Sequence, residues 1–165
     1  MARTRSFKFP NSFGDLDLLF DKLQRALSSL ILTTGGLAIK AGGSTLAKTA
    51  NTVYFTVDGK LYSKTASDMA ALDGTVTNAK FNVFVFSVAT DGTLKTSMGT
   101  ESATQAGVVF PTISDGEAII GFVIINPTGT GNFVGGTTAL DDATVTPNAV
   151  YVDTVGVFLP GIQNI

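Results

Sequence analysis

The side chains of this chain that could do chemistry are carboxylates and lysines, because its 165 residues include no histidine and no cysteine. Without these residue types, neither a Ser-His-Asp nor a Cys-His arrangement can form, and the usual zinc sites lose their imidazole and thiolate ligands. General base catalysis would fall to carboxylates or lysines. The only glutamates are Glu101 and Glu117, and several aspartates precede glycine, where they serve turns. We therefore expect a protein that is not an enzyme and that has no catalytic residues and no cofactor.

Two short stretches look like ligand sites at first sight. Gly129-Thr-Gly131 begins like a dinucleotide-binding loop, but the third glycine of that motif would fall where Val134 stands. Taken instead as a phosphate-binding loop, residues 131–136 lead into Thr137-Thr138 rather than Lys-Ser or Lys-Thr. Asp141-Asp142 could ligate calcium together with loop carbonyls, but a lone acidic doublet is more often simply solvated. We expect neither a nucleotide nor a metal ion here.

The composition predicts a mainly β protein. Charged residues make up 15% of the chain, well below the quarter that is usual in globular proteins, so threonine, serine, asparagine and glycine must supply much of the polar surface. Branched and aromatic side chains fit a pleated sheet, and the 18 glycines supply turns. The net charge of −2 gives no general support for nucleic-acid binding.

The charge is unevenly distributed along the chain. Residues 1–95 hold all 11 basic residues and 7 acidic ones, a net of +4, whereas residues 96–165 hold 6 acidic residues and no basic one, a net of −6. The first part of the chain is therefore suited to acidic surroundings and the last part is repelled by them. The alternative is that the uneven charge has no functional cause and reflects chance variation on a surface with few charges.

Tight turns are marked by Asp-Gly pairs, which favour two-residue hairpins. The pairs are Asp58-Gly59, Asp73-Gly74, Asp91-Gly92 and Asp115-Gly116. The first lies between predicted strands at 52–57 and 60–64, and the third between strands at 81–89 and 93–97. Residues 81–86 and 118–125 are apolar at nearly every position, which predicts central strands covered on both faces. Short, regularly spaced strands predict an antiparallel β-sandwich or jelly-roll-like domain over residues 36–165.

Residues 1–35 are predicted to form a separate unit, a basic arm followed by a short amphipathic helix over 12–31. Apolar residues recur in the helix at alternating spacings of three and four, which is a heptad seam. The seam consists of Phe13, Leu16, Phe20, Leu23, Leu27 and Leu30. An isolated helix of this length is marginal in water, so it needs a partner. We predict that the seam is an oligomer interface, most simply of a homotrimer, and the alternative is that it packs on its own sheet.

Two further segments are candidates for contact with a partner. The N-terminal arm combines basic and apolar side chains, and we predict that it attaches to a partner protein, although chain ends are commonly disordered. Its candidate residues are Arg3, Arg5, Phe7, Lys8 and Phe9. The second segment is a long irregular stretch over 126–144, of a length that is usually functional or mobile. Phe133 and Val134 lie in its middle and either pack back on their own domain or dock on a neighbour.

The sequence carries no recognisable targeting segment. Acidic residues interrupt the basic start, so we expect no secretory signal peptide, and there is no run of 18 or more apolar residues that could span a membrane. We therefore expect a protein that is made and kept in a cytosol-like compartment or released from one by lysis.

Together, the arm, the heptad helix, the Thr/Gly-rich β domain and the lack of histidine and cysteine resemble small accessory virion proteins of tailed bacteriophages, and most closely their capsid decoration (cement) proteins. The segments "AKFNVFVF" (79–86), "DGKLYSK" (58–64) and "GFVIINPTGTGNFVGGTTALDDATVTPNAVYV" (121–152) add to this resemblance. It implies a trimer or another small cyclic oligomer, made in the host cytoplasm and bound to the capsid exterior, that ties major capsid protein subunits together without direct contact with nucleic acid or membrane. The alternative is a head- or tail-fibre module that binds host glycans or another virion protein.

Overall fold

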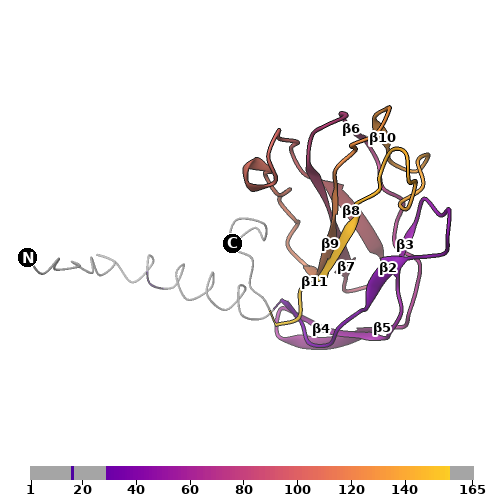
Figure 1. Ribbon diagram of the computed structural model, residues 1–165. Coiled ribbons are helices and arrows are strands. Elements are labelled where there is room, and N and C mark those ends of the chain that lie inside the picture. The colour runs from indigo at the N-terminus through magenta and orange to yellow at the C-terminus, as the bar shows by residue number, and fades with distance from the viewer. Residues whose placement is uncertain (1–15, 17–28, 157–165) are drawn as a thin grey trace, which may run out of the picture.

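The computed structural model describes residue 16 and residues 29–156, and the second of these stretches folds into a β domain (Figure 1). Every pairing between its strands is antiparallel, which confirms the predicted mainly β, antiparallel fold class. A 3-10 turn, η1 (Gln105–Gly107), is the one named helical element in the described residues. The strands are β1 (Leu30–Ile31), β2 (Leu37–Ile39), β3 (Ala47–Thr49), β4 (Val53–Val57), β5 (Lys60–Lys64), β6 (Thr75–Val76), β7 (Asn82–Ala89), β8 (Leu94–Met98), β9 (Glu117–Ile125), β10 (Phe133–Val134) and β11 (Val150–Asp153).

The largest sheet has four strands in the order β11-β9-β7-β8. Its two inner strands, β7 and β9, are the segments predicted to be central, and nearly all of their residues are buried. The strand β8, whose sequence is largely polar, lies at one edge of this sheet. A β-bulge between Phe86 and Ser87 shifts the register of β7 against β9.

Both faces of this sheet are covered, which explains why β7 has no polar side. Phe84, Phe86 and Val88 enter the main core on one face. Val83 and Val85 enter a second, smaller cluster on the other face. The chain between β8 and β9 supplies the cover of that second face through Val108, Phe110 and Ile113, and the ring of Phe110 meets that of Phe122 edge-on with centroids 5.0 Å apart.

A three-stranded sheet in the order β1-β4-β5 closes the main core from the opposite side. Figure 1 shows β4 and β5 at the lower end of the domain, away from β6 and β10 at the upper end. The β4–β5 hairpin turns at Asp58-Gly59, where both residues have positive φ (51° and 72°). This is the backbone of a type I′ turn, and the hairpin predicted there is confirmed.

Only half of the Asp-Gly pairs join paired strands. Asp91-Gly92 closes the β7–β8 hairpin, as predicted. Gly74 and Gly116 also have positive φ (103° and 81°), but they precede β6 and β9, whose partners come from elsewhere in the chain. Both predicted hairpins are therefore confirmed, and the other two pairs mark turns only, because the dipeptide specifies a turn and not which strands pair across it.

Two small two-stranded sheets complete the domain, β2-β3 and β10-β6. The second brings residues 133–134 beside residues 75–76, so the long stretch after β9 returns to the domain at its middle. The finer prediction of a sandwich or jelly roll is not established by these four sheets and stays a prediction.

The predicted N-terminal helix over 12–31 is not supported by the structure. Its last two residues form β1, with Leu30 opposite Thr56 and Ile31 opposite Phe55. Burial of Ile31 and pairing with β4 outweigh the helical spacing at this end, as tertiary contacts commonly outweigh local propensity. The β domain therefore already includes residues 30–31, before the predicted boundary at 36. The other seam residues except Leu16 lie outside the described residues, as does the whole arm: Arg3, Arg5, Phe7, Lys8, Phe9, Phe13, Phe20, Leu23 and Leu27.

Candidate functional site

Glu117 belongs to a buried polar cluster on the large sheet. The hydroxyl of Ser87 donates a hydrogen bond to Glu117 Oε2 at 2.6 Å, and Lys95 Nζ lies 2.6 Å from Oε1. The Glu117 side chain is 5% exposed and Ser87 is fully buried. The hydrogen bond with Glu117 raises the pKa of Lys95. Both carboxylate oxygens of Glu117 are thus engaged within the chain, so the cluster compensates a buried carboxylate and serves the fold.

Glu101 belongs to a different cluster. It accepts hydrogen bonds from Lys80 Nζ at 2.7 Å and from the backbone N–H and the hydroxyl of Thr77 at 2.9 and 3.0 Å. The hydrogen bond from Lys80 is the largest cause that lowers the pKa of Glu101 to about 2. Each glutamate is thus engaged by its own lysine, and they do not form a shared pair of carboxylates.

The adjacent carboxylates of Asp141 and Asp142 point to different partners. Asp142 accepts hydrogen bonds from the hydroxyl and N–H of Thr144 at 2.6 and 2.8 Å, and these bonds lower its pKa. Both oxygens of Asp141 lie 3.0 Å from the backbone N–H of Gly43. In residues 29–156 no group of three or more acidic side chains is arranged to hold a metal ion. Asp142 therefore stabilises the loop between β10 and β11, and Asp141 connects this loop to the turn between β2 and β3.

The stretch compared above with a nucleotide loop is packed on the chain itself. A Cβ at Gly129 would overlap the backbone carbonyl of Thr144, which explains the need for glycine there. Phe133 is fully buried, and its ring meets that of Phe84 edge-on at 5.9 Å. Of the two alternatives for Phe133, packing on its own domain therefore holds. Val134 next to it is 39% exposed.

No described residue covers one face of the three-stranded sheet. Side chains alternate between the two faces of a strand, and directly paired residues share a face. Ile31, Phe55 and Tyr62 point inward, and the last two stack with ring centroids 5.6 Å apart. The residues between them point outward. This outer face consists of Leu30, Leu32, Tyr54, Thr56, Leu61 and Ser63.

The outer face is uncharged and exposes three large side chains to solvent. Leu32 is 47% exposed, Tyr54 48% and Leu61 64%, and none of its six residues carries a charge. The solvent-facing side of an antiparallel sheet is normally polar, and a contiguous exposed apolar patch marks an interaction site. The outer face therefore has the composition of a contact surface.

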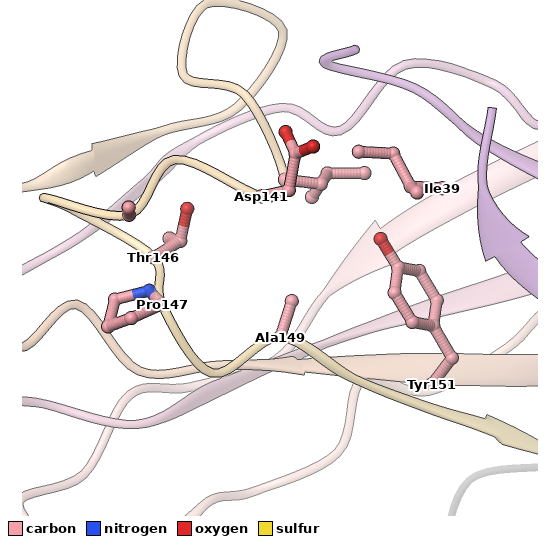
Figure 2. Close-up of a pocket in the computed structure, with 8 residues that line it drawn as sticks. Ile39, Asp141, Thr146, Pro147, Ala149 and Tyr151 are labelled. Carbon is pink, nitrogen blue, oxygen red and sulfur yellow. The ribbon is translucent and has the colours of Figure 1, made fainter. Parts of the chain in front are cut away.

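A pocket of about 260 Å³ lies between β2, the chain before β11, and β11 itself. Figure 2 shows Asp141 on one side and Tyr151 on another, with the hydroxyl of Tyr151 pointing toward Asp141 and Ile39. The lining residues are Ile39, Leu140, Asp141, Ala143, Thr146, Pro147, Ala149 and Tyr151. They come from segments far apart in the sequence, which the Asp141–Gly43 contact holds together.

One polar group of the pocket has no partner. The hydroxyl of Tyr151 is buried and forms no hydrogen bond, whereas the hydroxyl of Thr146 donates to the carbonyl of Ala139 at 2.8 Å. Burial, and to a smaller extent the charge of Asp141, raises the pKa of Tyr151 to about 12. The phenol is neutral at physiological pH, as an ordinary tyrosine is, and can donate a hydrogen bond.

Sequence reasoning missed both surfaces. The outer face had a signal, because Leu30 and Leu32 frame Ile31 and Tyr54 lies between two apolar residues, but such runs equally fit a strand covered on both faces. The pocket had no signal, since its lining residues follow no motif.

Comparisons with known proteins name no relative: no family model, no curated protein and no solved structure matches the chain. No helix within the described ranges has the length and apolar character needed to cross a bilayer. The function must therefore be argued from the outer face, the pocket and the sequence.

Proposed function

We propose that the chain is a non-enzymatic virion structural protein, a homotrimeric capsid decoration protein that binds the outer surface of an assembled phage head and stabilises it. The observation that carries this proposal is the outer face of β1-β4-β5, which is uncharged, exposes several large hydrophobic side chains and is left uncovered by the described residues. The cores of protein interfaces are likewise depleted in charge. A protein built to assemble needs such a face, whereas an enzyme needs reactive groups, and the glutamates found here are engaged in structural clusters.

The occupant of the outer face is a second copy of the chain. Leu30 is both the last residue of the predicted heptad seam and the first outward residue of β1. Only Ser28 and Ser29 separate it from Leu27, the previous seam residue. An oligomer joined through the seam would bring the outer faces of neighbouring copies together at the end of the seam, and each would cover apolar surface of the next.

Attachment to the head falls to the N-terminal arm. Arg3, Arg5 and Lys8 supply positive charge beside Phe7 and Phe9, a combination suited to an acidic and partly apolar surface of the major capsid protein. A protein that binds only the assembled shell stabilises that shell by mass action. A trimer engages several capsid subunits at once, so modest contacts add up.

The proposed trimer is tested by sedimentation of two charge variants. Leu61 on the outer face is 64% exposed and Val109 in the loop before β9 is 60% exposed, so lysine at either site leaves the core intact. Leu61→Lys is expected to shift the trimer toward monomer, because the charge would be buried between copies, and Val109→Lys is expected to have no effect. A wild-type protein that is monomeric at every concentration, or equal behaviour of the two variants, contradicts the proposed oligomer.

The proposed role on the particle is tested by removal and addition. Heads stripped of the protein are expected to rupture at lower temperature than intact heads, and adding the full chain back is expected to restore the threshold. Deleting residues 1–10 should leave the β domain folded but reduce the occupancy of the head. Equal rupture thresholds with and without the protein contradict a cementing role.

The alternative function, a head- or tail-fibre module that binds host glycans, has one observation in its favour, the pocket between β2 and β11. The pocket does not require the alternative, because a decoration protein on the capsid exterior is also exposed to its surroundings.

A further inference from the structure

The pocket between β2 and β11 holds unused hydrogen-bonding capacity at two separate points. The Tyr151 hydroxyl is buried with no partner. A buried polar group of this kind is uncommon in native structures and calls for an explanation, of which a partner from outside the chain is one. The carboxylate of Asp141 receives only the N–H of Gly43 and forms no ion pair with any described residue, so lone pairs remain on both of its oxygens.

The rest of the pocket limits the size and character of a ligand. Its wall is apolar, being formed by Ile39, Leu140, Ala143, Pro147 and Ala149. Its volume of about 260 Å³ is below the range of pockets that take drug-sized molecules. The space therefore fits one small ring with an apolar side, and it is too small for a dinucleotide or a folded peptide.

The two polar groups together favour a ligand that carries both donors and acceptors. The carboxylate of Asp141 can only accept, whereas the neutral phenol of Tyr151 can donate one hydrogen bond and also accept. An ammonium group could donate to both groups but would leave the phenol proton without an acceptor, and an anion would be repelled by Asp141. A ring of hydroxyl groups supplies donors and acceptors side by side, and its C–H groups can pack on the apolar wall.

We propose that this pocket binds a single sugar ring, with hydroxyl groups between Asp141 and Tyr151. This inference goes beyond the proposed assembly role and does not depend on it. The pocket is built from β2, the 140–149 segment and β11, whereas the outer face belongs to β1, β4 and β5. A protein that oligomerises through the outer face would retain one sugar site in each copy, and weak sites repeated on a particle add up to useful avidity.

The test is a titration of the full chain followed by amide proton–nitrogen correlation spectra. The probes are the methyl glycosides of glucose, galactose, mannose and N-acetylglucosamine, with Nα-acetyl-lysine amide as an ammonium probe. At least one glycoside is expected to shift the signals of Ile39 and of residues 140–151 with millimolar affinity, while the lysine derivative shifts none. Absence of shifts from all glycosides, or shifts from the lysine derivative alone, overturns the proposal.

Matched variants identify the groups that bind. Tyr151→Phe and Asp141→Asn are each expected to weaken binding by roughly tenfold, because each removes one hydrogen bond to the ligand. Tyr54→Phe and Asp58→Asn make the same chemical changes far from the pocket and are expected to leave binding unchanged. Ala149→Leu, which fills the pocket and keeps both polar groups, is expected to abolish binding. Binding that persists in all three pocket variants overturns the proposal even if one of them perturbs the loop.

Discussion

The two larger sheets of this domain differ in how completely the chain covers them. The four-stranded sheet is buried on both faces, and its buried carboxylate, Glu117, is compensated by Ser87 and Lys95. Residues 29–156 cover the three-stranded sheet on its inner face only, and its outer face carries no charge. An uncovered sheet that faced only water would carry polar residues. The large sheet therefore stabilises the chain itself, whereas the outer face of the small one is the surface to which the proposed oligomer contact is assigned.

The largest difference in stability is expected between two variants that each truncate one side chain, one on the large sheet and one on the small sheet. Phe84→Ala removes a fully buried ring that packs on Phe133 and should lower the free energy of unfolding by about 3–5 kcal/mol. Leu61→Ala removes an exposed side chain of the outer face and should change it by no more than about 0.5 kcal/mol. Urea unfolding of both variants, at protein concentrations low enough to dissociate any oligomer, measures these changes. Comparable losses in the two variants would mean that the outer face is covered within one chain.

The next effect tests whether the stretch after β9 is part of the packed domain. Gly129→Ala should destabilise the protein by about 1–3 kcal/mol, because the new methyl group would meet the carbonyl of Thr144. Gly131→Ala is the matched control, since a Cβ there meets open space and its backbone needs no positive φ. Urea unfolding of both variants is the measurement. Equal stability of the two variants would mean that the loop around Gly129 can shift at little cost in free energy. The loop would then not be part of the tightly packed core.

A smaller effect on stability is expected when the pH is lowered. The pKa of Glu101 is lowered from 4.5 to about 2 by Lys80 and Thr77. A carboxylate with a depressed pKa in the folded state stabilises the protein fully above its unfolded pKa, and this contribution is lost as the pH falls from about 4.5 toward 2. Glu101→Gln should therefore lower the melting temperature at neutral pH and reduce its fall over that acidic range. Melting curves of both proteins at several pH values test this, and parallel pH profiles would contradict it.

The sequence predicted the elements that short-range chemistry dictates. The β4–β5 hairpin followed from Asp58-Gly59, because these residues tolerate the positive φ that the turn requires. The central strands β7 and β9 followed from their unbroken apolar runs, since only burial on both faces suits such runs. These are properties of consecutive residues and can be recognised without knowing the partner strands.

The remainder depends on long-range contacts that no local pattern contains. The helical spacing that ended at Leu30 did not reveal that residues 30–31 pair with β4. Phe133 looked equally suited to a neighbour until its contact with Phe84 was seen. The pocket joins Ile39 to Tyr151 across more than a hundred positions, and its specific feature, a buried hydroxyl without a partner, is defined only once the surrounding chain is in place.

The smallest effect on stability is expected from removing the Tyr151 hydroxyl. In the free protein the Tyr151 hydroxyl forms no hydrogen bond, so Tyr151→Phe removes a buried polar group without breaking a contact. Burying an unpaired polar group is costly, whereas replacing it with an apolar one is nearly neutral. We therefore expect Tyr151→Phe to leave the free energy of unfolding unchanged within about 0.5 kcal/mol or to raise it slightly, in contrast to the loss of sugar binding by the same variant.

The matched control for this last substitution is Thr154→Val in the segment after β11. Its hydroxyl is also buried, but it donates to the carbonyl of Ile119 at 2.5 Å. Removing it leaves a buried acceptor unsatisfied and should cost about 1–3 kcal/mol. Urea unfolding of the two variants in sugar-free buffer decides the matter. If Tyr151→Phe lowers the free energy of unfolding as much as Thr154→Val does, the phenol already has a hydrogen-bond partner within the chain. The polar groups of the pocket would then be satisfied internally, as Glu117 is on the large sheet.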